Sequence, residues 1–497
     1  MTDLERRTKV GVAWTALATA VAQIVTFVLG VALARLLRVE DFGIFAAILI
    51  FLELSSSVVS SGLVAALIQR REIGPQHYAT AFMLQLAAAA AICSAIAVVS
   101  PWVSLLLGID ETGPVLAVAS LYLLILPFIS TPTAILRKRI DFKTAGIADV
   151  LEQLVAGLIA VATALGGQGV WSLVSGRLGG YAFKALWLAR AVRWRPSLHY
   201  DPQARRDLLP FALRLVAVNT LNDLASKIDY FVVGRLLGPA ALGFYSRAYH
   251  LMTFPLTKIT NAMNVVLFSA FSDVQHEPAA LKRAVLKSLC YASLLTFPFL
   301  VGLFWVAEPF VSVVYGEKWI SAVAPLRVIC FAGLFLSIEP IAVSAIVSRG
   351  FVGFEVRRQA IYLVLLAILV PLGTLGGVVG VAWGVLGAAG IFLFMLQRLL
   401  ERLLGIGAIE LIYVMGPAAA ACGAMSALLA IHRLIAVERW GAGAPAFLLT
   451  GVPLGVASYA LALVWMRRRL GEGLAIEVLT ELQGLLAGAL RRVPRLR

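Results

Sequence analysis

The chain has 497 residues, of which 61% are hydrophobic and only 14% are charged. Soluble domains usually carry about a quarter charged residues, so this composition excludes a water-soluble enzyme and indicates a polytopic membrane protein. The net charge of +15 does not indicate a nucleic-acid partner, because the basic residues lie at the ends of apolar runs and not in one stripe.

Apolar runs long enough to cross a bilayer as helices occur fourteen times along the chain. The first run continues into Arg35 and is too long for a cleaved signal peptide, so we expect it to be a transmembrane helix. The approximate limits of the runs are 10–33, 42–68, 79–107, 114–136, 145–165, 170–189, 209–236, 242–271, 285–315, 323–348, 358–373, 377–398, 411–431 and 445–466.

Lysine and arginine are distributed unequally between the two sets of loops that these helices create. Of the 42 basic residues, 29 lie on the face that includes both termini, 6 lie on the opposite face and 7 lie within the runs. Short loops rich in Lys and Arg stay in the cytoplasm. The sequence therefore predicts that both termini are cytoplasmic.

A segment between the first and second helices recurs 200 residues later. ARLLRVEDFGIFA (34–46) aligns with GRLLGPAALGFYS (234–246), and the shared residues are Arg35/Arg235, Leu36/Leu236, Leu37/Leu237 and Gly43/Gly243. Because six helices separate the two copies, both halves have the same orientation in the membrane, as in parallel repeats. We therefore expect an all-α polytopic membrane protein with two six-helix lobes around a central cavity.

The domain boundaries follow from this repeat. We expect an N-terminal lobe over 1–190, a basic cytoplasmic linker over 191–208, a C-terminal lobe over 209–402, two extra helices over 403–466 and a basic tail over 467–497. In the tail, Leu474, Val478 and Leu482 are spaced along one helical face. This pattern is typical of an amphipathic helix on an anionic membrane surface; the alternative is a frayed basic tail that only fixes topology.

Many charged and polar side chains lie within the apolar runs, where a charge at the bilayer centre costs about 2.5–3.5 kcal/mol. Spacings of three and four residues predict polar stripes on the seventh and eighth helices. We expect these stripes to line a water-filled cavity. The candidate binding residues are Glu53, Arg177, Arg214, Asn219, Asp223, Lys227, Arg247, Lys258, Asn261 and Glu339.

An alternative interpretation is that these charges only neutralise one another and fix helix packing. Depth in the membrane allows the pairs Asp229 with Arg247, Asp223 with Lys227 or Lys258, Glu53 with Arg177, and Lys184 with Asp149 or Glu152. Cations outnumber acids at mid-depth in the second half. Arginine and lysine suit phosphate groups, and Asn, Ser and Thr suit sugar hydroxyls, so we expect an anionic, sugar-bearing substrate.

Searches for catalytic and metal-binding motifs find little. The four cysteines are scattered singly, without metal-ligand spacing, and the chain has no GxSxG elbow, Walker loop or HExxH motif. We expect no enzyme activity, no metal and no cofactor. A small-residue series, Gly376, Gly380, Gly384 and Ala388, predicts close helix packing.

Three segments resemble a known family. They are ARLLRVEDFGIFA with SSGLVAALIQRREI (60–73), DYFVVGRLLGPAALGFYSRAYHLMTFP (229–255) and VLFSAFSDVQ (266–275). Together they are similar to the oligosaccharide-lipid flippases of the polysaccharide transporter family, within the multidrug/oligosaccharidyl-lipid/polysaccharide exporter superfamily. The last segment departs from the family pattern, with Ser269 in place of proline and Asp273 in place of a basic residue.

The resemblance implies a bacterial inner-membrane flippase that moves an undecaprenyl-pyrophosphate-linked oligosaccharide by alternating access. It implies the lipid-linked oligosaccharide and membrane lipids as partners, with polysaccharide polymerase and glycosyltransferases of the same pathway, and leaves a coupling ion, Na⁺ or H⁺, undetermined. Two other functions are considered: a cation-coupled drug exporter of the same superfamily, which would prefer an acidic cavity, and a membrane glycosyltransferase or polysaccharide polymerase.

Overall fold

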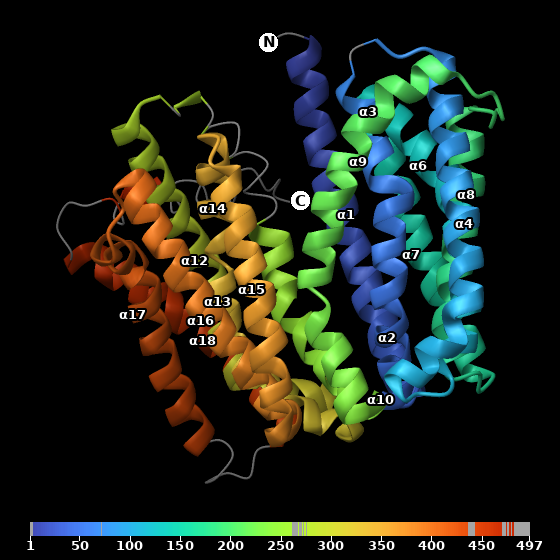
Figure 1. Cartoon of the computed structure of the whole chain (residues 1–497). Coiled ribbons are helices and arrows are strands. Elements are labelled where there is room, and N and C mark those ends of the chain that lie inside the picture. The colour runs from blue at the N-terminus through green and yellow to red at the C-terminus, as the bar shows by residue number, and fades with distance from the viewer. Residues whose placement is uncertain are drawn as a thin grey trace, which may run out of the picture. The chain divides into compact units, whose positions relative to one another are not determined.

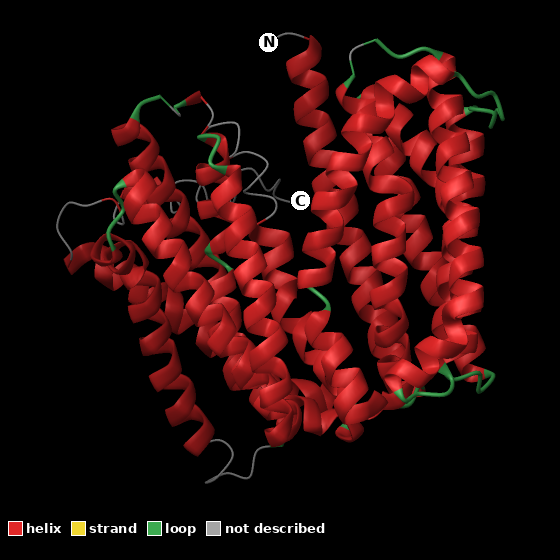
Figure 2. Ribbon diagram, viewed as in Figure 1, coloured by secondary structure: helices red, strands yellow, loops and turns green. Residues whose placement is uncertain are grey.

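The computed structural model describes residues 3–70, 72–260, 267, 271, 273–274, 276–435, 443–469, 474, 477–478 and 480–481. Every regular element in these ranges is a helix, as Figure 2 shows. The predicted all-α fold is therefore confirmed. The described chain divides into two compact units, Met1–Ser246 and Arg247–Arg497.

The first unit is a helical bundle (Figure 1). Its elements are α1 (Asp3–Leu36), α2 (Val39–Ser56), η1 (Ser57–Ser61), α3 (Gly62–Gln69), α4 (Pro75–Leu107), α5 (Thr112–Ala119), α6 (Tyr122–Lys138), α7 (Phe142–Leu165), α8 (Val170–Val192), α9 (Pro202–Ala225) and the first part of α10 (Ile228–Pro255).

The second unit is also a bundle of long helices. It contains the rest of α10, η2 (Leu256–Thr260), α12 (Pro278–Phe310), η3 (Val311–Tyr315), η4 (Glu317–Ala322), α13 (Val323–Leu336), α14 (Glu339–Ser348), α15 (Val352–Gly373), η5 (Thr374–Gly376), α16 (Gly377–Leu404), α17 (Ala408–Arg433) and α18 (Ala444–Arg469). One apolar core of this unit joins α12, α14, α16 and α17.

Eleven stretches of the described chain are long and apolar enough to cross a membrane. Two of them, Pro202–Phe254 and Gly353–Leu404, each cover two of the predicted crossings, and α8 is not among the eleven. The fourteen predicted crossings are therefore compatible with the structure, and the chain is a multi-pass membrane protein.

The two repeat copies have the same break in the same place. In the first copy α1 ends at Leu36 and α2 begins at Val39. In the second copy α10 loses helical geometry at Gly238, where φ is 83° and ψ is −179°, and resumes at Pro239. Positions 39 and 239 are equivalent under the 200-residue offset. A left-handed φ strains residues that carry a Cβ atom, which accounts for glycine at position 238.

The copies also pack on one another through equivalent residues. A Cβ atom added to Gly43 would lie 1.8 Å from the carbonyl oxygen of Pro239, and one added to Gly243 would lie 2.3 Å from that of Val39. Gly43 of the first copy thus lies against Pro239, where the helix of the second copy resumes. Gly243 of the second copy lies against Val39, where α2 begins. This reciprocal contact supports the predicted repeat and explains why residues up to Ser246 belong to the first unit.

The region predicted as one helix over 209–236 contains a turn. α9 ends at Ala225, where the Ser226 amide still reaches the Asn222 carbonyl, but the Lys227 amide bonds the Leu224 carbonyl three residues back. The predicted single helix is therefore interrupted within its polar stripe, so that Asn219 and Asp223 lie on α9, Lys227 in the turn and Tyr230 on α10.

The small-residue series of residues 376–388 mediates close helix packing, as predicted. On α16, a Cβ atom at Gly380 would lie 2.1 Å from the Gly373 carbonyl oxygen, and one at Gly384 would lie 2.5 Å from that of Leu369. Only glycine allows α15 and α16 to approach so closely. Gly376 has open space around it and takes no part.

The described part of the tail packs on protein. Val478 is fully buried in the core of the second unit, and Leu474 packs against that core. On the same segment Glu477 accepts hydrogen bonds from Arg283 (2.8 Å) and Lys287 (3.0 Å) of α12. The prediction that this face lies on lipid is wrong for Leu474 and Val478, because both pack on the core of the second unit and Glu477 between them pairs with α12; Leu482 lies outside the described residues.

Candidate functional site

Glu53 and Lys227 form an ion pair in the first unit. Glu53 lies on α2, and Lys227 lies in the turn between α9 and α10. The Lys227 Nζ is 3.0 Å from the Glu53 carboxylate, and 4.9 Å from the centre of the Tyr230 ring. The turn at 226–227 places the ammonium between these two partners. Glu53 was expected to pair with Arg177, so the structure corrects that assignment.

Arg177 of α8 lies instead against two tyrosine rings. Its guanidinium carbon is 4.6 Å from the ring centre of Tyr122 and 5.4 Å from that of Tyr181. The two rings meet edge to face at 5.3 Å. Cation–π contacts of this kind stabilise a desolvated cation by about 2 kcal/mol or more. They hold Arg177 in place without neutralising its charge.

One hydrogen bond links this arginine to the Glu53 region. The Tyr122 hydroxyl donates to the Leu52 carbonyl at 2.6 Å, and Leu52 precedes Glu53 on α2. Glu53, Tyr122, Arg177, Lys227 and Tyr230 therefore form one continuous group, which we call the central cation cluster. It joins α2, α6, α8 and α10 within the first unit.

The two cations of the central cation cluster differ in how they are compensated. Lys227 pairs with Glu53 and also lies in the field of Asp229, whereas Arg177 makes no ion pair with any residue that the structure describes. Its Nε atom is buried without a hydrogen-bond partner. A buried donor without a partner costs about 1–3 kcal/mol, and an anionic ligand would supply the missing acceptor. The cluster is chemically suited to bind a phosphate or pyrophosphate group.

Asp229 does not neutralise the cluster through a direct bond in the structure. Its side chain is buried. The carboxylate accepts hydrogen bonds from the Tyr245 hydroxyl at 2.6 Å and from the Tyr230 amide at 2.9 Å. These bonds satisfy both carboxylate oxygens. Asp229 thus fixes the start of α10 and holds the Tyr230 backbone beside Lys227.

The other predicted residues of the first unit lie on α9. Arg214 is exposed, and Asn219 and Asp223 are half-buried. None of the three makes a hydrogen bond or an ion pair with another described residue. The structure therefore brings Glu53, Arg177 and Lys227 into one group and leaves these three along the helix that leads to it.

The predicted residues of the second unit lie in two different places. Arg247 of α10 faces the rings of Tyr315 and Trp319 at 5.5 and 5.6 Å. Glu339, the first residue of α14, pairs with Arg358 at 2.9 Å. The side chain of Lys258 and the whole of Asn261 lie outside the described residues.

Arg358, at the start of the predicted crossing 358–373, lies within α15, and sequence reasoning did not select it as a site residue. Its side chain is only 2% exposed, and it also pairs with Glu355 at 2.7 Å and lies 3.6 Å from the centre of the Phe392 ring. The spacing of Glu355 and Arg358 by three residues was a signal for a helical pair. Burial of that pair was not visible in sequence, because it depends on the packing of α14, α15 and α16.

Lys184 shows the alternative, purely structural use of a charge within a span. Its ammonium lies 2.7 Å from Asp149 and 2.5 Å from Glu152, both on α7. This pairing was predicted from depth and is confirmed. In contrast to Arg177, Lys184 has its charge fully compensated and helps to hold α7 against α8.

No grouping of His, Cys, Asp and Glu suited to a metal ion occurs among the described residues. The four cysteines are all buried and unpaired by disulfides. The chemistry available at the central cation cluster is therefore that of binding through charge, aromatic rings and hydrogen bonds.

Comparison with known proteins gives a family match over much of the chain. The profile of the family described as "Polysaccharide biosynthesis protein" matches residues 32–324, more than half of the chain. The lipopolysaccharide biosynthesis protein WzxC of Escherichia coli is 26% identical over 77% of this chain and 79% of its own length. The succinoglycan biosynthesis transport protein ExoT of Rhizobium meliloti is 26% identical over 58% of this chain and 59% of its own length.

Solved structures show the same fold at low identity. The lipid II flippase MurJ, in an inward closed conformation, matches with a TM-score of 0.71 and 14% identity over 91% of this chain and 99% of its own. An inward-facing multidrug transporter of the MATE family matches with a TM-score of 0.64 and 14% identity over 78% and 98%. By its fold and its family match, this chain belongs to the polysaccharide biosynthesis protein family.

Proposed function

We propose that this chain is a flippase that translocates a polyprenyl-pyrophosphate-linked oligosaccharide across the bacterial inner membrane for surface polysaccharide biosynthesis. The observation that carries the proposal is Arg177, a cation of the central cation cluster that has no ion-pair partner among the described residues and whose Nε atom is buried without a hydrogen bond. An uncompensated cation in a membrane is costly, and a pyrophosphate substrate offsets that cost. The names of the relatives WzxC and ExoT support a role in polysaccharide biosynthesis and transport.

In this mechanism each part of the site has a separate task. Arg177 and Lys227 hold the pyrophosphate, and Arg214 and Lys258 are further cations along the path that the substrate follows during translocation. Asn219, Asn261 and nearby hydroxyls bind sugars, while Asp223, Arg247 and Glu339 tune the charge of the path. The polyprenyl tail stays in lipid, and alternating access exposes the site to one side of the membrane at a time.

The proposed orientation places both termini in the cytoplasm. The bias of 29 basic residues against 6 supports it. The proposed partners are the glycosyltransferases that build the oligosaccharide on the cytoplasmic side and the polymerase that uses it on the other. The chain itself acts as a transporter and does not join sugar units.

The test is translocation in proteoliposomes. A short-chain polyprenyl-pyrophosphate sugar is placed in one leaflet, and its appearance in the other is measured with Arg177→Gln, with the triple variant Arg214→Gln/Lys227→Gln/Lys258→Gln, and with wild type. Hydrogen bonds to charged groups contribute about 1.5–3 kcal/mol each, so we expect the rate to fall about tenfold or more in each variant.

Arg398→Gln is the matched control, because Arg398 is an exposed cation paired with Glu401 on α16. It should translocate at the wild-type rate. Wild-type rates in the triple variant and in Arg177→Gln would contradict the proposed site. Elongation of the sugar by purified protein would contradict the proposed function and favour a polymerase.

A further inference from the structure

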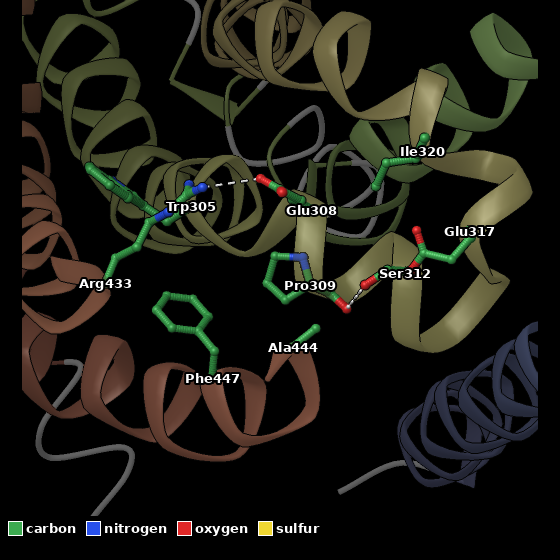
Figure 3. Close-up of a pocket in the computed structure, with 9 residues that line it drawn as sticks. All are labelled: Trp305, Glu308, Pro309, Ser312, Glu317, Ile320, Arg433, Ala444 and Phe447. Carbon is green, nitrogen blue, oxygen red and sulfur yellow. Dashed lines mark hydrogen bonds and ion pairs between the residues drawn. The ribbon is translucent and has the colours of Figure 1, made fainter. Parts of the chain in front are cut away.

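The second unit contains a cavity of about 320 Å³ at the C-terminal end of α12 (Figure 3). Its walls come from α12, η3, η4, the end of α17 and the start of α18. The side chains that matter for the argument are Trp305, Glu308, Ser312, Glu317, Arg433 and Phe447. None of them belongs to the sequence-predicted site.

Two aromatic rings of the cavity are held by neighbouring rings. Phe447 of α18 is 2% exposed and stacks on His432 at 5.2 Å with an angle of 21°. Trp305 of α12 packs edge to face against Phe304 at 5.7 Å. Fixed rings lose little conformational entropy when a ligand packs against them. The half-buried Trp305 supplies apolar surface to a ligand, and the buried Phe447 backs the wall of the cavity.

The carboxylate of Glu308 is held by two guanidinium groups. Its Oε2 atom accepts from Arg327 and from Arg433, each at 3.1 Å; Figure 3 shows the bond from Arg433. Its Oε1 atom makes no hydrogen bond to another residue that the structure describes. An acceptor oxygen is thus held at a fixed position beside Trp305.

Two more polar residues, Ser312 and Glu317, line the same cavity. The Ser312 hydroxyl donates to the Pro309 carbonyl at 3.3 Å and keeps its oxygen lone pairs. Glu317 is exposed and makes no ion pair with another described residue. The cavity therefore combines aromatic surface with several acceptors and the donors of Arg433.

This combination matches a neutral sugar. A sugar ring has an apolar face of C–H groups that packs on aromatic rings, and hydroxyls that both donate to carboxylates and accept from guanidinium groups. A pyrophosphate is disfavoured, because Glu308 and Glu317 balance the charges of Arg327 and Arg433 and leave the cavity without a net positive charge. A lipid chain is disfavoured because it would leave these polar groups without partners. The volume lies at the lower end of ligand sites, which span about 300–1,000 Å³.

The position of the cavity relates it to transport. Lys287 near the start of α12 pairs with the tail, and Glu308 lies 21 residues later on the same helix. At 1.5 Å per residue this is about 32 Å, close to the thickness of the hydrocarbon core. With the tail in the cytoplasm, as proposed above, the cavity opens at the outer face.

We propose that the cavity lined by Trp305, Glu308 and Phe447 binds a neutral sugar unit of the exported oligosaccharide at the outer face of the membrane. The inference rests on the proposed function for its biological role.

The test measures binding of free sugars, which requires neither the lipid carrier nor translocation. Full-length protein in lipid nanodiscs is examined by saturation-transfer difference NMR with glucose, galactose and N-acetylglucosamine, each at up to about 20 mM, since an affinity near 1 mM corresponds to about −4 kcal/mol. We expect saturable transfer to at least one of these sugars. Inorganic pyrophosphate should not displace it.

The variants assign the signal to the cavity. Trp305→Leu should reduce the affinity about fivefold or more, Glu317→Gln should reduce it about twofold, and Trp305→Phe, which keeps a ring, should retain most of it. Trp465→Leu is the control, because Trp465 is 61% exposed on α18 and does not line the cavity. It should bind like wild type.

Three results would overturn the inference: no saturable transfer to any of the neutral sugars, equal affinity in Trp305→Leu and wild type, or displacement of the sugar by pyrophosphate. Each can be separated from failure of the proposed function, which is measured by translocation in liposomes. A wild-type chain that translocates the lipid-linked sugar but binds no free sugar would leave the flippase proposal intact and remove the cavity from it.

Discussion

Glu53 and Lys227 show how two charges can share a place inside a helix bundle. Lys227 is 22% exposed and Glu53 is 38% exposed, with 3.0 Å between them. Removing one partner leaves the other charge without compensation in a region of low dielectric. Removing both leaves two neutral polar groups of similar size.

This predicts a non-additive effect on stability. Lys227→Gln alone and Glu53→Gln alone should each lower the free energy of unfolding by about 1–3 kcal/mol, less than for a fully buried pair because Glu53 is partly exposed. The double variant should lower the free energy of unfolding by less than the sum of the two single losses. Thermal melting of the purified variants in detergent measures this, and strictly additive losses would show that the two charges do not interact.

The ion pairs also show what the sequence could and could not predict at this scale. The partners of Lys184 followed from helical depth, because Asp149 and Glu152 lie on one long, regular helix. The partner of Glu53 did not, because the turn at 226–227 has no sequence signal stronger than the helical pattern around it. The tyrosines beside Arg177 were also missed, since aromatic residues in apolar runs look like ordinary core residues.

Among the elements, the described part of the tail has a clear electrostatic attachment. Glu477 accepts from Arg283 and Lys287, and Glu481 accepts from Lys287 at 2.7 Å and from the Tyr291 hydroxyl. These hydrogen bonds hold the pKa of Glu477 and of Glu481 below the ordinary value for glutamate, mainly through Arg283 for the first and Lys287 for the second.

The attachment should depend on pH in a defined direction. A carboxylate whose pKa is lowered in the folded state stabilises that state at all pH values above its unfolded pKa of about 4.3, and this stabilisation is lost as the pH falls through the lowered value. The tail should therefore stay docked from neutral pH down to about 4.3 and detach progressively as the pH falls from there through the lowered pKa values of Glu477 and Glu481. Hydrogen exchange of the 474–481 peptide, corrected for the intrinsic rate at each pH, measures this.

Neutral variants give an independent check at constant pH. Glu477→Gln/Glu481→Gln should speed amide exchange in 474–481 at pH 7, and Arg398→Gln, which removes an exposed pair on α16, should not. Exchange that stays slow in the double variant would show that the apolar contacts of Leu474 and Val478 hold the tail without the acids.

The elements also show where sequence periodicity is reliable. Long helices such as α4, α7 and α17 begin and end within a few residues of their predicted limits, because their apolar runs are bounded by glycine, proline or charges. The described part of the tail packs on protein, although lipid was expected, because an amphipathic face is equally suited to lipid and to another helix. The cavity beside Trp305 could not be predicted, since its walls come from helix ends far apart in sequence.

For the whole molecule, the reciprocal contact between the two repeat copies is a structural constraint that both halves share. Gly43 and Gly243 each lie against backbone, so neither can gain a side chain without moving a helix. Overpacking of this kind costs about 1–3 kcal/mol. The constraint belongs to the fold and not to any ligand.

Alanine at these positions should therefore destabilise the protein. Gly43→Ala and Gly243→Ala should each lower the melting temperature, and the double variant should lower it by less than the sum, because the first substitution already separates the copies. Gly30→Ala on α1 is the control, since its Cβ atom would meet nothing within 4 Å. Unchanged melting in both single variants would show that the copies do not depend on this contact.

The same contact shows how a duplicated chain becomes unequal. Position 229 carries an aspartate whose counterpart at 29 is a leucine, and position 245 carries the tyrosine that bonds this aspartate, where position 45 has a phenylalanine. The two copies thus differ at both members of this bonded pair. In an isologous dimer of identical chains the two copies of a position are always the same residue, whereas the copies within one chain can differ. A cargo with a charged end and a sugar end has no two-fold symmetry, and unequal copies can offer it two different surfaces.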